Sequence, residues 1–462
     1  MKSAQKKAAQ KKTYRKANKL ENITDMDVGF TLSQAIAEAS RCLLCFDAPC
    51  TKGCPAGTDP GKFIWKLRVR NIKGSIRTIK QNNILGGICG VACPVDQLCQ
   101  KACSATEIGR PIEIGKLQRF LVEHGWAIGF NPIEKAPSVD RKVAVIGSGP
   151  AGLACAADLA KEGIKVTIFE ARAQPGGVLR YGVPSFRLAD EFLDRELEDI
   201  EQLGVKIKCS SRIETDGVDK LLKKRFEAVF IATGIWKPYR LDLPGADLKN
   251  VTTATELLAA ARDGGVARMA KMVRNRNVAI IGGGSVAMDV ANTCKGLGAN
   301  KVYCVCLESL AQIPADKTDL DMARDNAVVI KPQCQVTEII GRQGRVTGVR
   351  GTETEWVEPG SLAVSNARAV PDTEFKLRVD AVVMAIGTGP EPGSRAICPA
   401  IKYRKSGLIR TRKDGVSTSV KNVYAGGDIT RGPALIVNAV ADGKEAARRI
   451  IAAVGRTEGK DA

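Results

Sequence analysis

Eight cysteines fall between residues 42 and 103 and form two sets of four. The first set reads Cys42-x2-Cys45-x4-Cys50-x3-Cys54-Pro55, and the second reads Cys89-x3-Cys93-Pro94-x4-Cys99-x3-Cys103. A compact run that ends in Cys-Pro is typical of iron–sulfur binding, whereas zinc sites usually draw two closely spaced cysteine pairs onto one metal. The pattern predicts two iron–sulfur clusters, with zinc or uncoordinated thiols as the alternatives.

A glycine-rich turn of a second chemical type follows the cysteines. Gly147, Gly149 and Gly152 form a G-x-G-x-x-G motif between an apolar strand pattern and a helical pattern. The first glycine permits a tight turn, the second lets the backbone approach a pyrophosphate, and the third lets helix and sheet pack closely. Glu170 ends the next strand pattern, where a carboxylate can accept from a ribose hydroxyl. These residues predict a dinucleotide site.

The same arrangement recurs later in the chain. Its candidate contact residues are Gly282, Gly284, Ser285, Val286 and Ala287, in the G-x-G-x-x-A form. Leu307-Glu308 stands at the end of the following strand pattern, where a carboxylate suits a free ribose 2′-hydroxyl and an arginine would suit a 2′-phosphate. The site is therefore expected to favour NADH over NADPH, unless Lys301, Lys317 or Arg324 supplies the charge.

The elements around these motifs predict an α/β protein with two doubly wound nucleotide domains. Strand patterns lie at 142–146, 165–169, 228–232, 277–281, 301–306, 381–385 and 422–425, and helical patterns at 151–162, 286–297 and 439–453. Because the last strand pattern follows the second unit, we expect the second domain to be inserted in the first. The predicted parts are a basic tail (1–30), a helical iron–sulfur domain (31–130), a first nucleotide domain (140–240 and 405–462) and a second (241–404).

Composition excludes several classes of protein. The 462 residues are 44% hydrophobic and 26% charged, which fits a globular chain of about three domains. No apolar run could span a bilayer and the start has no signal-peptide core, so we expect a soluble cytosolic protein. The net charge of +20 attracts anionic partners. A basic zinc protein that binds nucleic acid is the alternative from another class, although no series of stacking aromatics supports it.

Two basic segments contribute to this charge. The first 19 residues hold eight basic and no acidic side chains, as expected of a solvated tail or a docking arm. A single helix is predicted over residues 61–80. Its seven cations are Lys62, Lys66, Arg68, Arg70, Lys73, Arg77 and Lys80. This helix is interpreted either as a solvated face or as a docking surface for an acidic partner.

The nucleotide motifs carry a family resemblance. G-S-G-P-A-G at 147–152, Glu170, A-T-G at 232–234 and A-G-G-D at 425–428 resemble flavoproteins with two dinucleotide sites, including glutamate synthase small subunits. The resemblance implies FAD on the first unit and a nicotinamide cofactor on the second. It adds Gly177, Gly427 and Asp428 to the FAD candidates and Gly387 to the NAD candidates.

The cysteine region carries a closer resemblance. The segments S-R-C-L-L-C-F-D-A-P-C, T-D-P-G-K-F-I, G-V-A-C-P-V-D-Q-L-C-Q-K-A-C and I-G-K-L-Q-R-F resemble the amino-terminal half of dihydropyrimidine dehydrogenase, a separate electron-input subunit in bacteria. The resemblance implies one cluster on Cys42, Cys45, Cys50 and Cys103, and another on Cys54, Cys93, Cys99 and Gln118. Spacing alone would have chosen Cys89 instead of Gln118. The F-R-L segment implies that Arg187 lies beside FAD, and family members that use NADPH have a basic residue where Glu308 stands.

These resemblances imply an oxidoreductase subunit that passes electrons from NADH through FAD to two [4Fe–4S] clusters. The clusters would supply an FMN-containing α/β-barrel partner that reduces uracil or thymine to the 5,6-dihydropyrimidine, because no pyrimidine site is recognised in the sequence. Hydride transfer requires stacked rings rather than a protein acid or base, so no catalytic side chain is predicted. The alternatives are a glutamate-synthase-type small subunit or another ferredoxin-linked NAD(P)H oxidoreductase.

Overall fold

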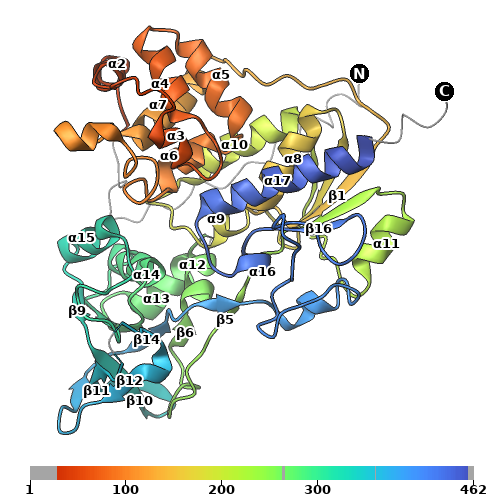
Figure 1. The fold of residues 1–462 in the computed structure, drawn as a ribbon. Helices are drawn as coiled ribbons and strands as arrows, with labels where there is room; N and C mark the ends of the chain where they lie inside the picture. The colour runs from red at the N-terminus through yellow and green to blue at the C-terminus, as the bar shows by residue number, and fades with distance from the viewer. Residues whose placement is uncertain (1–28, 263–265, 359, 456–462) are drawn as a thin grey trace, which may run out of the picture.

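The computed structural model describes residues 29–262, 266–358 and 360–455. It contains an amino-terminal helical region and two α/β regions, each built on its own parallel sheet (Figure 1). The predicted basic tail (1–30) lies almost wholly outside the described residues. Within the described part of the chain, no helix combines the length and the apolarity needed to cross a bilayer.

The amino-terminal region is helical, as predicted. Its helices are α2 (Leu32–Ser40), α3 (Pro49–Lys52), α4 (Pro60–Arg68), α5 (Ile72–Asn82), α6 (Gly86–Ala92) and α7 (Ile114–Ala127), with a 3-10 turn η1 (Ser104–Ile108). The apolar stripes of α4, α5 and α7 form one core that includes Phe63, Ile79 and Leu117. Cys89 lies in the middle of α6, and the other seven cysteines lie at helix ends and in the loops that join these helices, so the core fixes where each thiol lies.

The prediction of one helix over residues 61–80 is wrong. The chain reverses between α4 and α5, where Arg70 has a left-handed φ of 60° and the side chain of Asn71 accepts from the backbone of Gly74 at 2.9 Å. The reversal lets both helices pack against α7. It also buries Lys80 and leaves Lys66 only partly exposed, so five of the seven cations remain exposed. These are Lys62, Arg68, Arg70, Lys73 and Arg77.

The first sheet has the strand order β16-β4-β1-β2-β3, with every pair parallel. Its strands are β1 (Lys142–Ile146), β2 (Lys165–Phe169), β3 (Lys206–Lys208), β4 (Ala228–Ile231) and β16 (Val423–Ala425). The associated helices are α8 (Pro150–Lys161), α9 (Val178–Tyr181), α10 (Asp190–Gln202), α11 (Gly217–Lys223), α16 (Asp428–Arg431) and α17 (Ile436–Val454). Strand β16 returns to this sheet after the second sheet is complete, which confirms the predicted insertion.

The second sheet has the order β6-β14-β7-β8-β9 and is also parallel. Its strands and helices are β6 (Val251–Thr253), β7 (Asn277–Ile281), β8 (Lys301–Val305), β9 (Val329–Lys331), β14 (Ala381–Met384), α12 (Ala254–Arg262), α13 (Val266–Val273), α14 (Ser285–Gly296) and α15 (Lys317–Asp325). An antiparallel layer packs beside it, formed by β10 (Cys334–Arg342), β11 (Arg345–Trp356), β12 (Ala367–Ala369) and β13 (Phe375–Leu377). The outgoing and returning chains pair as β5 (Lys237–Pro238) and β15 (Thr388–Gly389).

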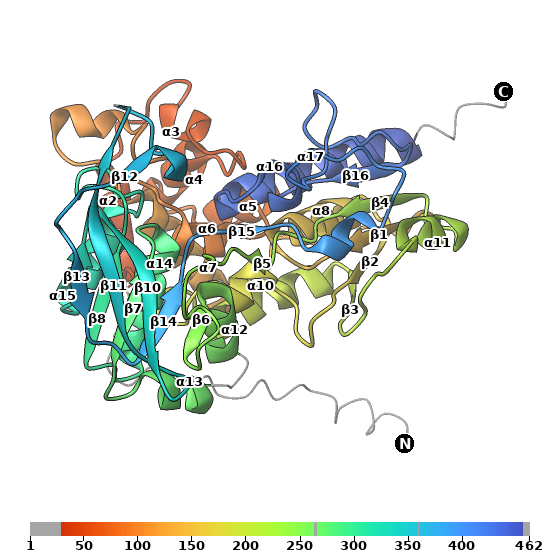
Figure 2. The same ribbon diagram turned by 90° about the horizontal axis from the view of Figure 1, so that it is seen from below.

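Buried charges connect the helical region to the first α/β region. Glu196 of α10 is 0% exposed and accepts from the backbone N–H groups of Gly87 and Ile88 at 2.9 and 3.1 Å. Lys80, 3% exposed, lies 2.8 Å from Glu196 and 2.8 Å from Asp199. Buried ions are tolerated when they are paired and hydrogen-bonded, as they are here. Figure 2 shows from below how the helical region also lies next to the second α/β region, where Gln97 donates to Asp316.

Candidate cofactor sites

The first glycine turn has a backbone that only glycine fits. Gly147 has φ of 101°, and a Cβ there would lie 2.4 Å from the carbonyl oxygen of Ala232. A Cβ on Gly152 would lie 2.0 Å from the carbonyl oxygen of Gly147. Gly149 caps the amino end of α8, and no atom lies within 4 Å of its Cβ position. The start of α8 is therefore open to an anionic group such as a pyrophosphate.

Glu170 lies beneath this turn and is buried. Its carboxylate accepts from the backbone N–H of Ser148 at 3.0 Å, from the Ser148 hydroxyl, and from the backbone N–H of Arg172 at 2.8 Å. A carboxylate has about four acceptor positions, so one remains for a ribose hydroxyl. The structure thus adds a positioning role that the sequence did not predict, because Glu170 also fixes the turn.

The remaining FAD candidates surround the same turn. Gly177 has φ of 55°, and its Cβ would lie 2.7 Å from the Cα of Gly149. Gly427 precedes Asp428, the first residue of α16, and burial raises the pKa of Asp428 to about 6. The hydroxyl of Thr233, in the A-T-G turn, is buried and has no hydrogen-bond partner within the described residues. A glycine cradle with an unpaired buried hydroxyl fits a bound dinucleotide, which supplies polar atoms.

The second glycine turn repeats the geometry of the first. Gly282 has φ of 136°, and its Cβ would lie 2.4 Å from the carbonyl oxygen of Ala385. Gly284 caps α14 and is open within 4 Å. At the third motif position Ala287 is fully buried against the sheet. The Ser285 hydroxyl accepts from the backbone N–H of Asp316 at 3.1 Å, and Val286 is half exposed. Gly387, with φ of 99°, lies between β14 and β15.

Glu308 lies beside this second turn. Its Oε2 is 3.1 Å from the Cβ position of Gly283. Two of the cations that could have supplied positive charge for a 2′-phosphate are paired with another residue. Lys317 pairs with Asp321, and Arg324 lies 3.5 Å from the Asp321 carboxylate. Lys301 is exposed at the opposite, amino end of β8. Glu308 therefore places a carboxylate beside the second glycine turn, just beyond the carboxyl end of β8.

Arg187 lies between the two α/β regions. Its guanidinium pairs with Asp289 of α14 at 2.8 Å and with Asp319 of α15, while its buried Nε has no hydrogen-bond partner among the described residues. Burial raises the pKa of Asp289 to about 6, and Arg187 opposes this shift. The two carboxylates were not predicted, because nothing in their local sequence distinguishes them from surface residues.

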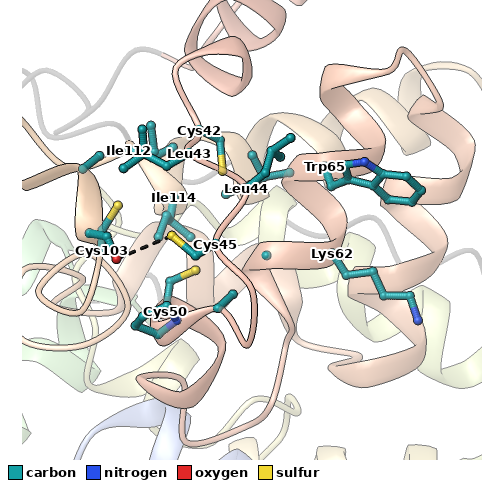
Figure 3. Close-up of a pocket in the computed structure, with 16 residues that line it drawn as sticks. Cys42, Leu43, Leu44, Cys45, Cys50, Lys62, Trp65, Cys103, Ile112 and Ile114 are labelled. Atoms are coloured by element: carbon teal, nitrogen blue, oxygen red, sulfur yellow. Dashed lines mark hydrogen bonds between the residues drawn. The ribbon is translucent and has the colours of Figure 1, made fainter.

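Cys42, Cys45, Cys50 and Cys103 surround one cavity of about 350 Å³, the first cysteine site (Figure 3). Figure 3 shows Cys103 reaching it from a different segment than the other three. In residues 29–262, 266–358 and 360–455, no three His, Cys, Asp or Glu side chains are grouped as they would be around a single metal ion. The four thiols instead border an open space, which suits a cluster in which each cysteine binds a different iron.

The second cysteine site borders a much smaller cavity. Cys54, Cys93, Cys99 and Gln118 line a cavity of about 20 Å³, and Cys89 lines it too. The Gln118 Nε2 donates to the carbonyl of Gly86, which leaves the amide oxygen as its metal-binding atom. Cys89 accepts from the Asn83 amide at 3.4 Å. The donor set of thiols and one amide fits an iron–sulfur cluster, and the structure keeps both Cys89 and Gln118 within reach.

Val437 of α17 also lines the second site, so this site adjoins the first α/β region. The two sites are neighbours as well. Burial raises the pKa of Cys99 to about 12, and the nearby thiols of Cys54 and Cys50 add to the shift. Cys50 belongs to the first site and Cys99 to the second, so the two sites are adjacent, and the second also adjoins α17.

Comparisons with protein families agree with this division of the chain. Residues 19–129 match the model of dihydropyrimidine dehydrogenase domain II with a 4Fe-4S cluster. Residues 141–443 match the model of the pyridine nucleotide-disulphide oxidoreductases.

Relatives and solved structures give the same result. The NAD-dependent dihydropyrimidine dehydrogenase subunit PreT of Escherichia coli is 36% identical, over 93% of this chain and 96% of PreT. The NADPH glutamate synthase small chain of E. coli is 30% identical, over 91% and 92%. Among structures, FprA from Mycobacterium tuberculosis matches with a TM-score of 0.58 at 19% identity, over 70% of this chain and 86% of FprA. Thioredoxin reductase from T. acidophilum has a TM-score of 0.51 at 20% identity, over 68% and 99%, and both structures support the fold.

Proposed function

Because the chain belongs to the pyridine nucleotide-disulphide oxidoreductase family, in the group that contains PreT and the glutamate synthase small chains, we propose that it is the electron-input subunit of a pyrimidine-reducing enzyme. It is an oxidoreductase that uses FAD, NAD(P)H and 4Fe-4S chemistry. In the proposed reaction, electrons pass from NADH through FAD to two [4Fe–4S] clusters. An FMN-containing α/β-barrel partner then reduces uracil or thymine, in the cytoplasm.

The geometry supports a division of roles between the glycine turns. FAD is assigned to the turn at Gly147, with Glu170 on its ribose and the open start of α8 on its pyrophosphate. The nicotinamide cofactor is assigned to the turn at Gly282. Flavin chemistry supplies the step from a hydride to single electrons. The protein's own contribution is to orient the two cofactors and to position the clusters.

The position of the second cysteine site is the observation that carries the proposal. This site lies between α17, which follows the Asp428 turn assigned to FAD, and the first cysteine site. Electrons are therefore proposed to pass from FAD to the second site, then to the first site and then to the partner. We assign Cys54, Cys93, Cys99 and Gln118 to the inner cluster, and Cys42, Cys45, Cys50 and Cys103 to the outer cluster.

A preference for NADH follows from Glu308. Its carboxylate beside Gly283 accepts from a 2′-hydroxyl and repels a 2′-phosphate. The glutamate synthase relative is an NADPH enzyme by name and is the second candidate function. The higher identity to PreT, a subunit of an NAD-dependent enzyme by name, favours the pyrimidine reaction.

Two measurements test the proposal. Dye reduction by the holoprotein should give a higher kcat/KM with NADH than with NADPH, and Glu308→Arg should shift the ratio toward NADPH. Uracil should be reduced only when the FMN-containing partner is added. Equal use of both nucleotides would contradict the role of Glu308, and uracil reduction by the isolated chain would contradict the subunit assignment.

A further inference from the structure

Large apolar side chains lie exposed around the first cysteine site. Leu43 is 46% exposed, Leu44 44%, Phe46 101% and Trp65 49%. Leu43, Leu44 and Trp65 line the same cavity as the four cysteines, and Phe46 follows Cys45 directly. Figure 3 shows Leu44 and Trp65 on the side of the cavity where Lys62 extends outward. Single exposed apolar residues are ordinary, but a group of them at one redox site requires an explanation.

The backbone of this loop is held in an uncommon conformation. Leu44 has φ of 56° and Asp47 has φ of 53°. A bulky residue such as leucine rarely adopts the left-handed region, and such strain is typically found at functional sites. The carbonyl of Cys42 accepts from Arg68 at 2.7 Å, which ties the loop to α4. The loop thus holds apolar side chains toward solvent even though the core of the helical region lies next to it.

Cations surround these apolar residues. Among the residues that the structure describes, Lys62 and Arg70 are exposed and have no ion-pair partner. Arg68 is exposed as well, with one amino group on the Cys42 carbonyl. The carboxylate on the same loop, Asp47, pairs with Lys52 and adds no net charge. The surface formed by Leu43, Leu44, Phe46, Trp65, Lys62, Arg68 and Arg70, the exit face, is therefore apolar at its centre and positive at its rim.

We propose that the exit face docks the electron-accepting partner of this chain, a protein whose docking surface is apolar at its centre and acidic at its rim. The proposal rests on the proposed function, because it takes the first cysteine site as the outer cluster. Electron transfer falls steeply with distance, so the acceptor must approach the outer cluster closely. The exit face is the surface that surrounds the first site. An exposed tryptophan with an apolar surround is the type of residue that dominates binding energy in interfaces.

The first experiment measures the affinity of the holoprotein for the purified FMN-containing partner by titration. Trp65→Ser and Phe46→Ser should each raise Kd by about tenfold or more, as expected of central interface residues. Val364→Ser is the matched control, because Val364 is 71% exposed but lies in the second α/β region. It should leave Kd unchanged. Phe46→Ser and Val364→Ser should retain their iron content and their NADH-dependent dye reduction. Because Trp65 lines the cavity of the first site, the Kd of Trp65→Ser is compared only at equal iron content.

The second experiment tests the rim. Lys62→Glu and Arg70→Glu should raise Kd and make binding less dependent on salt, since exposed charges act through a screened field. Lys405→Glu, at an exposed position far along the chain, is the control and should behave like the unmodified protein. Loss of the salt dependence in the rim variants alone supports docking by an acidic surface.

The third experiment does not depend on a loss of affinity. A photoactivatable benzophenone amino acid at Phe46 should cross-link the purified partner, whereas the same group at Val364 should not. If Phe46→Ser and Trp65→Ser bind the partner as tightly as the unmodified protein does, the proposal that the exit face docks the partner is wrong, and the proposed function stands. If the unmodified protein neither binds the partner nor reduces uracil with it, the proposed function fails and the docking proposal fails with it.

Discussion

The two cysteine sites use nearly the same residue types but differ in their surroundings. The first site borders a cavity of about 350 Å³ beneath exposed Leu43 and Phe46. The second borders a cavity of about 20 Å³, and Val437 of α17 contributes to its lining. The first site therefore faces outward and the second faces the region assigned to FAD. The proposed electron path requires this difference in surroundings. One cluster must accept electrons from the flavin, and the other must pass them to a separate protein.

The difference arises from parts of the chain that are distant in sequence. Helix α17 contributes Val437 to the lining of the second site, and Glu196 of α10 binds the start of α6, which leads to Cys93. Among the described residues, Leu43, Leu44 and Phe46 of the loop from Cys42 to Cys50 remain exposed. The exposure of a metal site thus depends on what packs over it and not on the spacing of its ligands.

Replacing one cysteine ligand in each site should give the largest effect, because each replacement should remove one cluster and leave the other in place. Cys103→Ser is expected to lose the outer cluster, about half of the iron, because three thiolates hold a cluster poorly. NADH-dependent dye reduction should persist in Cys103→Ser, while uracil reduction with the partner should stop. Cys99→Ser should lose the other half of the iron. Iron analysis and EPR spectra of the reduced protein provide the measurement, and loss of all the iron in both variants would contradict two separate sites.

Replacing the fourth ligand of the second site should have the next largest effect on iron content. Gln118→Ala is expected to lose the inner cluster, about half of the iron, whereas Cys89→Ala should retain it, since the family resemblance assigns the amide as ligand. The hydrogen bond from Asn83 gives the Cys89 thiol another partner. Asn83→Ala is a control that removes this bond and should preserve the iron. The opposite result, with iron lost only in Cys89→Ala, would reverse the assignment.

The buried charges at the second site should matter for stability. Glu196→Gln leaves Lys80 paired with Asp199 alone. Removing one partner of a buried pair costs up to about 3–5 kcal/mol, and the remaining pair with Asp199 should keep the cost below that range. Glu201→Gln, an exposed position on the same helix, should change the free energy of unfolding little. Urea denaturation of the holoprotein, followed by flavin fluorescence and by iron release, measures both. The comparison predicts that Glu196→Gln releases iron from the second site before the first.

Sequence reasoning succeeded where function requires a local pattern. Gly147 and Gly282 each follow a buried strand and precede a helix, so their turns and the inserted second sheet were predictable. The sequence-based predictions were wrong where contacts between distant segments determine the structure. The helix predicted over 61–80 is interrupted at Arg70, because α4 and α5 fold back to share one core with α7. Lys80, predicted on a basic face, is buried against Glu196.

Charge near the second site should produce the smallest effect. Lys444 of α17 is partly buried and donates to the carbonyls of Ala56 and Asn82 beside that site. Burial lowers the pKa of Lys444, and the neighbouring thiols of Cys54 and Cys89 oppose this. A cation stabilises the reduced, more negative form of a nearby cluster, so Lys444→Met should lower the reduction potential of the inner cluster.

The outer cluster serves as the internal reference for this measurement. Lys444→Arg keeps the charge and should restore the potential. Lys161 of α8 is the matched control, because it also donates to a carbonyl of the helical region, that of Gln81 at 3.1 Å, but is neutralised by Asp158 at 2.8 Å. Lys161→Met should therefore shift the inner potential less than Lys444→Met. An EPR-monitored redox titration resolves the two clusters, and an equal shift of both would mean that Lys444 acts on the fold and not on the inner cluster.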